Sequence, residues 1–142
     1  MPRALTLCLA LLGAAPALAH EYLVGDLAIV HPHTRPTAPG TTVAGGFMEL
    51  FNASDTPERL LAARSGVADL SFFDAAADGG AGARRASAID LPPGRSVFLE
   101  PDSLQIRLAD LEEPLSSGDR VPVTQELEQA GPEPGEVWVE GT

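Results

Sequence analysis

After residue 20, short apolar segments alternate with clusters of glycine and proline. The segments rich in β-branched or apolar residues are predicted as strands, at residues 23–30, 43–51, 59–65, 68–73, 86–91, 96–99, 105–108, 121–127 and 136–139. In residues 105–108 (QIRL), polar and apolar positions alternate, as a half-buried strand requires. The clusters at 32–46, 78–82, 92–94 and 131–135 are predicted as turns, and residues 108–115 as a connection or a single helical turn. This pattern predicts one all-β domain, a sandwich or a barrel.

The first nineteen residues have the pattern of an export signal. Arg3 supplies a positive charge, residues 5–15 form an apolar run too short to cross a membrane, and Ala-Leu-Ala at 17–19 is typical of a cleavage site. Cys8 lies inside this run, which fits poorly with a lipid attachment site. We therefore expect a periplasmic mature domain of residues 20–142 that begins with His20 and contains no membrane span.

Composition excludes several classes of function. The net charge of -11 argues against a broad basic face for nucleic acids. All nine basic residues are arginine, which excludes chemistry that needs a lysine. Because Cys8 is the only cysteine, neither a disulfide nor a cysteine metal site is expected in the mature domain. The nucleophile-elbow, zinc-helix and dinucleotide motifs are absent too, so we expect no enzymatic activity.

Several pieces of the sequence, taken in order, resemble the periplasmic copper chaperone family called PCu(A)C. They are HEYLVGDL at 20–27, HP at 31–32, AGGFMELFN at 44–52, IDLPPG at 89–94 and, most distinctive, GDRVPV at 118–123. The resemblance covers nearly the whole mature chain and implies a cupredoxin-like Greek-key β-barrel that binds copper. Members help to load the dinuclear copper A site of cytochrome oxidase. The implied partner is a copper acceptor, such as a cytochrome oxidase subunit or another periplasmic copper chaperone.

The sequence departs from this family at the copper site. Members generally carry the pattern His-x10-Met-x21-His-x-Met, a soft ligand set suited to Cu(I). In this sequence the four positions fall on Ser71, Arg84, Gln105 and Arg107. A guanidinium stays protonated and repels cations, so we predict no high-affinity Cu(I) site there. If Arg84 and Arg107 converge, their pocket would prefer a carboxylate; alternatively, both face solvent and pair with nearby acids.

The other candidate ligands are three histidines and one methionine. His20, as a new N-terminus, could chelate copper through its α-amino nitrogen and its imidazole. His31 and His33 are two residues apart in a proline-flanked stretch, and in an extended conformation they would point the same way and complete a copper site. Met48 is either a core side chain or a thioether ligand. For each histidine alone, a purely structural role is the alternative.

Two hypotheses follow from these patterns. In the first, the protein handles copper in the periplasm and uses a relocated N-terminal histidine site. In the second, it is a non-metal interaction module of the same fold that binds an acidic partner through an arginine-bearing pocket. An enzymatic role would require a redox copper site at His20.

Overall fold

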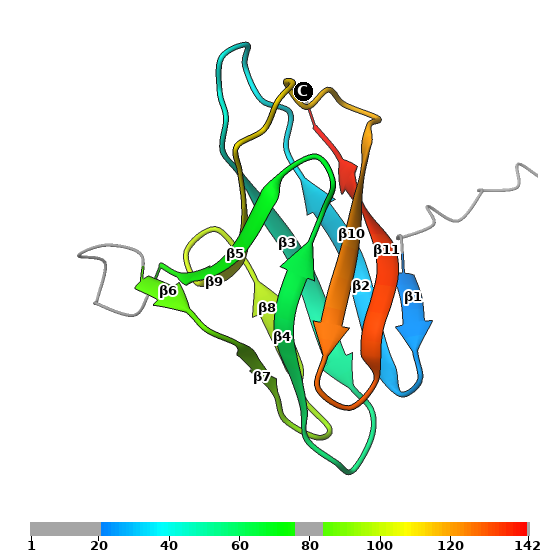
Figure 1. The fold of residues 1–142 in the computed structure, drawn as a ribbon. Coiled ribbons are helices and arrows are strands. Elements are labelled where there is room, and N and C mark those ends of the chain that lie inside the picture. Colours follow the sequence, from blue (N-terminus) through cyan, green and yellow to red (C-terminus); the bar gives the residue numbers. More distant parts are fainter. Residues whose placement is uncertain (1–20, 76–83, 142) are drawn as a thin grey trace, which may run out of the picture.

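The computed structural model describes residues 21–75 and 84–141, and these contain strands but no helix (Figure 1). The all-β class predicted from the sequence is therefore confirmed. Over the same two ranges, no helix is long and apolar enough to cross a membrane. The predicted signal at 1–19 and His20 lie outside the described residues.

The described strands are short and follow one another closely along the chain. They are β1 (Glu21–Val24), β2 (Leu27–Thr34), β3 (Ala44–Asn52), β4 (Glu58–Arg64), β5 (Asp69–Asp74), β6 (Arg84–Ala86), β7 (Ile89–Leu91), β8 (Ser96–Leu99), β9 (Leu104–Ala109), β10 (Arg120–Leu127) and β11 (Gly131–Val139). Residues 110–119 form a connection between β9 and β10, without the helical turn that was the alternative expectation.

The sheet curls into a nearly closed barrel. Its strand order is β6-β5-β9-β3-β2-β11-β10-β4-β7, with β1 paired to β2 and β8 paired to β3. Strands β6 and β7 stand at the two ends of this order, yet only Ser87 and Ala88 separate them in the chain. Three peptide links span roughly 10 Å at most, so the two ends of the sheet must approach each other.

Alternating side chains fill the interior of the barrel. Along β10, Val121, Val123, Gln125 and Leu127 are buried, while the residues between them are exposed or half-buried. Each buried aliphatic side chain stabilises the fold by roughly 1.5–3 kcal/mol, so a slip of one residue would expose the whole set. The polar exception is Gln125, whose Nε2 donates a hydrogen bond to Met48 Sδ at 3.2 Å.

Two predicted strands are wrong in extent. Residues 23–30 form the hairpin of β1 and β2 rather than one strand, with Val24 paired to Leu27. Gly25 in the turn has a φ of +58°, a left-handed conformation that glycine adopts without steric cost. Residues 86–91 likewise divide between β6 and β7.

The proline-glycine cluster at 131–135 is the first half of β11, although the sequence predicted a turn. Pro132 and Pro134 stand opposite Glu126 and Thr124 of β10. Strand β11 pairs with β2 only at Trp138 and Val139, so among the described strands residues 131–137 are paired on one side only. Proline is tolerated in such a position because it has no N–H to contribute to a second ladder.

Strand β1 packs on this half of β11 through Tyr22. A Cβ atom on Gly135 would lie 2.4 Å from the Tyr22 hydroxyl, so only glycine leaves room for the ring. Burial raises the pKa of Tyr22 to about 12, because the charged phenolate is poorly solvated there. The start of the described chain is thus fixed against the barrel wall.

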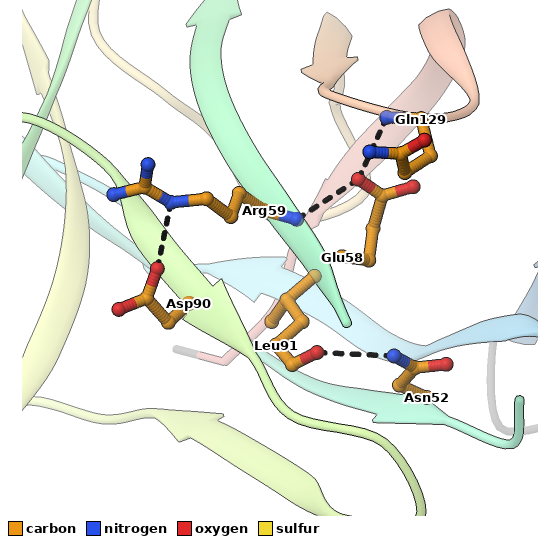
Figure 2. A network of polar contacts seen from close by, with 6 residues as sticks. All are labelled: Asn52, Glu58, Arg59, Asp90, Leu91 and Gln129. Carbon is orange, nitrogen blue, oxygen red and sulfur yellow. Dashed lines mark hydrogen bonds and ion pairs between the residues drawn. The ribbon is translucent and has the colours of Figure 1, made fainter. Parts of the chain in front are cut away.

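Polar contacts tie β4 to β7 at the sheet edge (Figure 2). Arg59 Nε donates to Asp90 Oδ1 at 2.7 Å, and the Arg59 backbone N–H donates to Glu58 Oε1 at 2.9 Å. Asn52 is 2% exposed and donates through Nδ2 to Leu91 O at 3.0 Å. An exposed ion pair contributes at most about 1 kcal/mol, whereas a buried amide left without partners would cost more, so Asn52 has a structural role.

Candidate functional site

Three of the four positions of the family's copper pattern share one face of the barrel. Ser71 of β5 stands directly opposite Arg107 of β9, and Phe73 stands opposite Gln105. Between them along each strand, Phe72 and Ile106 point into the core. Because side chains alternate along a strand, Ser71, Phe73, Gln105 and Arg107 point outward together. We call these four residues the β5–β9 face.

Arg84 does not belong to this face. It pairs with Asp74, the residue after Phe73, and by alternation it points to the opposite side of the sheet. Arg85 pairs with Phe73 and is the arginine that points the same way as the β5–β9 face. The sequence left open whether Arg84 converges with Arg107, and the strand register places Arg85 instead on the side of Arg107.

The groups on the β5–β9 face are poor metal ligands. The Arg107 guanidinium stacks on the Phe73 ring, with Cζ 3.6 Å from the ring centroid. Gln105 Nε2 donates a hydrogen bond to Pro101 O at 3.3 Å. A guanidinium carries no free lone pair, and its positive charge is attracted to the electron-rich ring face. This face therefore favours an anion over a cation.

His31 and His33 lie side by side near the end of β2. Their ring centroids are 4.2 Å apart and the rings are stacked, with an interplanar angle of 16°. The register between β2 and β3 shifts between Val30 and His33, and His31 has a φ of +49°, which is uncommon for a residue other than glycine. A bulge within β2 therefore brings the two imidazoles together, whereas the sequence predicted a turn from residue 32 and a shared direction of the two rings only in an extended conformation. We call them the His pair.

Each imidazole of the His pair has one nitrogen engaged by an oxygen atom. His31 Nε2 donates to Glu140 Oε2 at 2.6 Å, and His33 Nδ1 donates to His31 O at 2.8 Å. Carboxylate and carbonyl oxygens only accept, so these two nitrogens carry the protons. The second nitrogen of each ring, His31 Nδ1 and His33 Nε2, is the one that can bind a metal when the ring is neutral. Histidines that bind metals typically have their other ring N–H held in this way.

The position of Glu140 is set by the backbone. Its N–H donates to Thr34 O at 2.9 Å, directly after the parallel pairing of Val139 with Thr34. Thr34 is fully buried, and its hydroxyl donates to Gly45 O at 2.7 Å. The backbone of Glu140 is therefore fixed beside β2, and its carboxylate reaches His31.

A groove of about 500 Å³ lies on the other side of the His pair. The His33 ring is 5.7 Å from the Phe47 ring, and both line this groove. Met48 also lines it, but Met48 is 3% exposed and its Sδ accepts the hydrogen bond from Gln125 in the core. The structure thus brings His31 and His33 together and directs the Met48 sulfur toward a core amide.

The described residues do not form a complete metal site. Within ranges 21–75 and 84–141, no group of three histidine, cysteine, aspartate or glutamate side chains is arranged to hold a metal ion. His20 lies outside these ranges. The first described residue of β1, Glu21, stands opposite Val30, the residue before His31.

A family model described as "Putative lipoprotein LpqE-like" matches residues 27–139. The chain belongs to the LpqE-like family. No curated protein matches it.

Among solved structures, this LpqE-like chain is similar to PCuAC domains. The copper-bound PCuAC domain from PmoF2 is 31% identical, with a TM-score of 0.75 over 87% of this chain and 99% of that one. The apo PCuAC domain from PmoF1 is 27% identical, with a TM-score of 0.76 over 87% and 100%. Cu(I)-bound DR1885 from Deinococcus radiodurans is 21% identical, with a TM-score of 0.66 over 87% and 83%, and shares the fold. These similarities confirm the predicted PCu(A)C-like family.

Sequence reasoning missed two residues of this LpqE-like site. Glu140 contacts His31 across a separation of 109 residues, and no local pattern reveals such a pair. Phe47 is part of the AGGFMELFN segment, but the sequence does not indicate that its ring lies next to both His33 and Gly45. The only sequence signal for Glu140 is its place directly after the predicted strand 136–139, and this place does not indicate a contact with His31.

Proposed function

We propose that this protein is a PCuAC-like copper-handling protein that holds copper through the His pair and not on the β5–β9 face. The observation that carries the proposal is that one nitrogen of each stacked ring is hydrogen-bonded to an oxygen atom. Glu140 and the His31 carbonyl hold one N–H of each ring, which leaves one nitrogen of each ring available to a metal. Similarity to the copper-bound PCuAC domain from PmoF2 supports copper as the cargo.

The donor atoms favour Cu(II) over Cu(I). Imidazole nitrogen suits Cu(II), whereas thioether sulfur selects Cu(I). Met48 carries the only sulfur of residues 20–142, and it is engaged with Gln125. We therefore expect tighter binding of Cu(II) at the His pair than a methionine-rich site would give.

The N-terminus of the processed chain would supply further donors. Cleavage after Ala19 would give His20 a free α-amino group next to its imidazole. Glu21, the first described residue, stands opposite Val30, the residue before His31.

Export to the periplasm and transfer of copper to an acceptor protein complete the proposal. The acceptor would be a cytochrome oxidase subunit or another periplasmic copper chaperone, with no enzymatic step. The lipoprotein description of the LpqE-like family supports a location in the cell envelope. The Ala-Leu-Ala sequence at 17–19, together with Cys8 inside the apolar run, favours cleavage after Ala19 over lipid attachment.

A competition titration against Cu(II) and Cu(I) chelators tests the proposal, using the chain that begins at His20. We expect saturable Cu(II) binding that is lost in the His31→Ala/His33→Ala variant. The matched control is Gln105→Ala/Arg107→Ala on the β5–β9 face, which should retain binding. The opposite result, with binding lost in the control and kept in the histidine variant, would contradict the proposal. A chain that begins at Glu21 measures the contribution of His20.

A second candidate function is supported by the β5–β9 face. Arg107 lies on this face and Arg85 points the same way, so the two cations could bind a carboxylate-rich partner without any metal. Binding of a poly-glutamate peptide to the metal-free protein tests this function. We expect it to be lost in Arg85→Ala/Arg107→Ala if the function is real, and to be absent from the wild type if it is not.

A further inference from the structure

The groove beside His33 has an apolar floor and an acidic rim. It lies between β2, β3 and the turn that joins β8 to β9. Phe47, Phe98 and Leu99 are among its apolar lining residues, and Glu49, Glu100 and Asp102 contribute carboxylates. Arg35 is the one arginine that lines it. We call this feature the β8 groove.

Phe98 is the most exposed of the large apolar side chains that line the groove. It lies on β8 opposite Glu49 of β3, and 51% of its surface is exposed. Because burial of apolar surface is favourable, a partner that covers the Phe98 ring would gain binding free energy. Large aromatic residues beside a concave surface are typical centres of protein interfaces.

The groove is held in shape by hydrogen bonds within the chain. In the β8–β9 turn, Glu100 N–H donates to Leu104 O at 2.8 Å and Ser103 N–H donates to Glu100 O at 3.1 Å. Between β8 and β3, Ser96 Oγ donates to Glu49 Oε1 at 2.6 Å. Because these groups are already positioned, a partner would pay little of the entropy cost of ordering a binding surface.

Charge identifies the chemistry of the partner. Three carboxylates and one guanidinium line the groove, and the whole chain has a net charge of -11. This field attracts cations and repels acidic peptides. A suitable segment therefore carries basic side chains for the rim and a large apolar side chain for Phe98.

We propose that the β8 groove docks a partner protein through a segment in which a large apolar side chain lies between basic residues. The apolar side chain covers Phe98, and the basic residues pair with Glu100 and Asp102. Because His33 lines the same groove, a partner docked there lies beside the His pair. Docking does not depend on the proposed copper function, since none of Phe98, Glu100 and Asp102 is a proposed copper ligand.

Peptide binding to the metal-free protein tests the docking proposal. The probe is acetyl-Arg-Leu-Arg-Phe-Arg-amide, and acetyl-Arg-Ser-Arg-Ser-Arg-amide is the control with the same charge. We expect the first peptide to bind at least about tenfold more tightly, because burial of apolar side chains adds to the electrostatic attraction. The largest changes in backbone amide chemical shifts on peptide binding should fall in β8 and the β8–β9 turn.

Four variants decide whether the groove is the binding site. Phe98→Ser should weaken binding of the apolar peptide about tenfold, whereas Leu61→Ser, at an exposed apolar position of β4, should not change it. Glu100→Gln/Asp102→Asn should weaken both peptides several-fold. Glu112→Gln/Glu113→Gln removes the same charge outside the groove and should have less effect.

Three results would overturn the proposal. The first is equal affinity of the two peptides, which would mean general attraction to an acidic protein. The second is equal loss in the two carboxylate variants. The third is the absence of saturable binding of the apolar peptide below about 1 mM.

Discussion

Two regions of the barrel differ in what they offer to a cation. The β5–β9 face holds three of the four positions that the sequence assigned to the PCu(A)C copper pattern, and it carries a guanidinium stacked on Phe73. The His pair, on the far side of β3, carries two stacked imidazoles whose other N–H groups are held by oxygen atoms. One region repels a metal ion, and the other has the features that metal-binding histidines share.

This difference shows that the fold of the barrel does not by itself determine where a metal can bind. In the structure, Ser71 faces Arg107 across β5 and β9, so two positions that the sequence assigned to the copper pattern lie side by side without metal-binding side chains. A fold of this kind supplies positions, and function depends on the chemistry placed at them.

The largest expected effect comes from restoring soft ligands to the β5–β9 face. Ser71→His/Gln105→His/Arg107→Met replaces a cation with two imidazoles and a thioether at adjacent positions. We expect Cu(I) affinity at this face to rise from millimolar or weaker to micromolar or better, about a thousandfold. A Cu(I) competition titration measures the gain, with His31→Ala/His33→Ala in the background to remove the other region. No gain in a folded variant would mean that the register does not preserve a site.

A smaller effect is expected from Glu140, which acts on the His pair as a positioning residue. Glu140→Ala releases the His31 Nε2–H, and loss of such a partner lowers metal affinity by roughly 10–100-fold. The control is Glu136→Ala, which removes an exposed carboxylate of β11 that pairs with Arg120. Titration with Cu(II) should separate the two variants, and equal affinities would exclude the proposed role of Glu140.

Gly45 links the two regions, so a substitution there should disturb both. A Cβ atom at this position would lie 2.6 Å from Phe47 Cζ and 3.1 Å from Gln105 Oε1. Displacing Phe47, which neighbours His33, should destabilise the Gly45→Ala variant by about 1–3 kcal/mol. Urea unfolding checks the value against Gly66→Ala, where a Cβ atom would meet nothing within 4 Å. Equal stabilities would show that Phe47 moves without cost.

The smallest effect concerns Tyr22, which fixes β1 near the His pair. Burial raises the pKa of Tyr22 to about 12 from a usual value of 10.0, so the unfolded chain loses this proton at lower pH than the folded chain. Stability from the neutral ring is therefore complete below pH 10 and falls as the pH rises toward 12. The Tyr22→Phe variant cannot lose this proton, so its melting temperature should fall less than that of the wild type between pH 10 and pH 12. An identical fall in both proteins would contradict the prediction.

The barrel was predictable from the sequence because strand alternation is local. Strands β8 and β10 agree with their predicted positions within a residue, since turns and alternating apolar residues mark them. The sequence predicted only the second half of β11, at 136–139, because Pro132 and Pro134 are typical of turns, whereas a strand edge with one partner tolerates them.

The candidate site was only partly predictable. The nearness of His31 to His33 follows from their spacing, but their stacking depends on a bulge that the sequence does not mark. The contact with Glu140 joins opposite ends of the chain, and it arises only when β11 pairs with β2. The side of the sheet that Arg84 faces depends on register, which a shift of one residue reverses.

X-ray absorption spectroscopy of the copper-loaded chain that begins at His20 tests the central claim most directly. Met48 is the only sulfur-containing residue from position 20 onward. A sulfur ligand would therefore identify Met48 as a copper ligand, whereas nitrogen ligands would indicate histidine. The account predicts a first shell of nitrogen and oxygen with imidazole scattering, which becomes weaker in the His31→Ala/His33→Ala variant because only the imidazole of His20 is left. A sulfur atom in the first shell, or an unchanged spectrum in that variant, would contradict it.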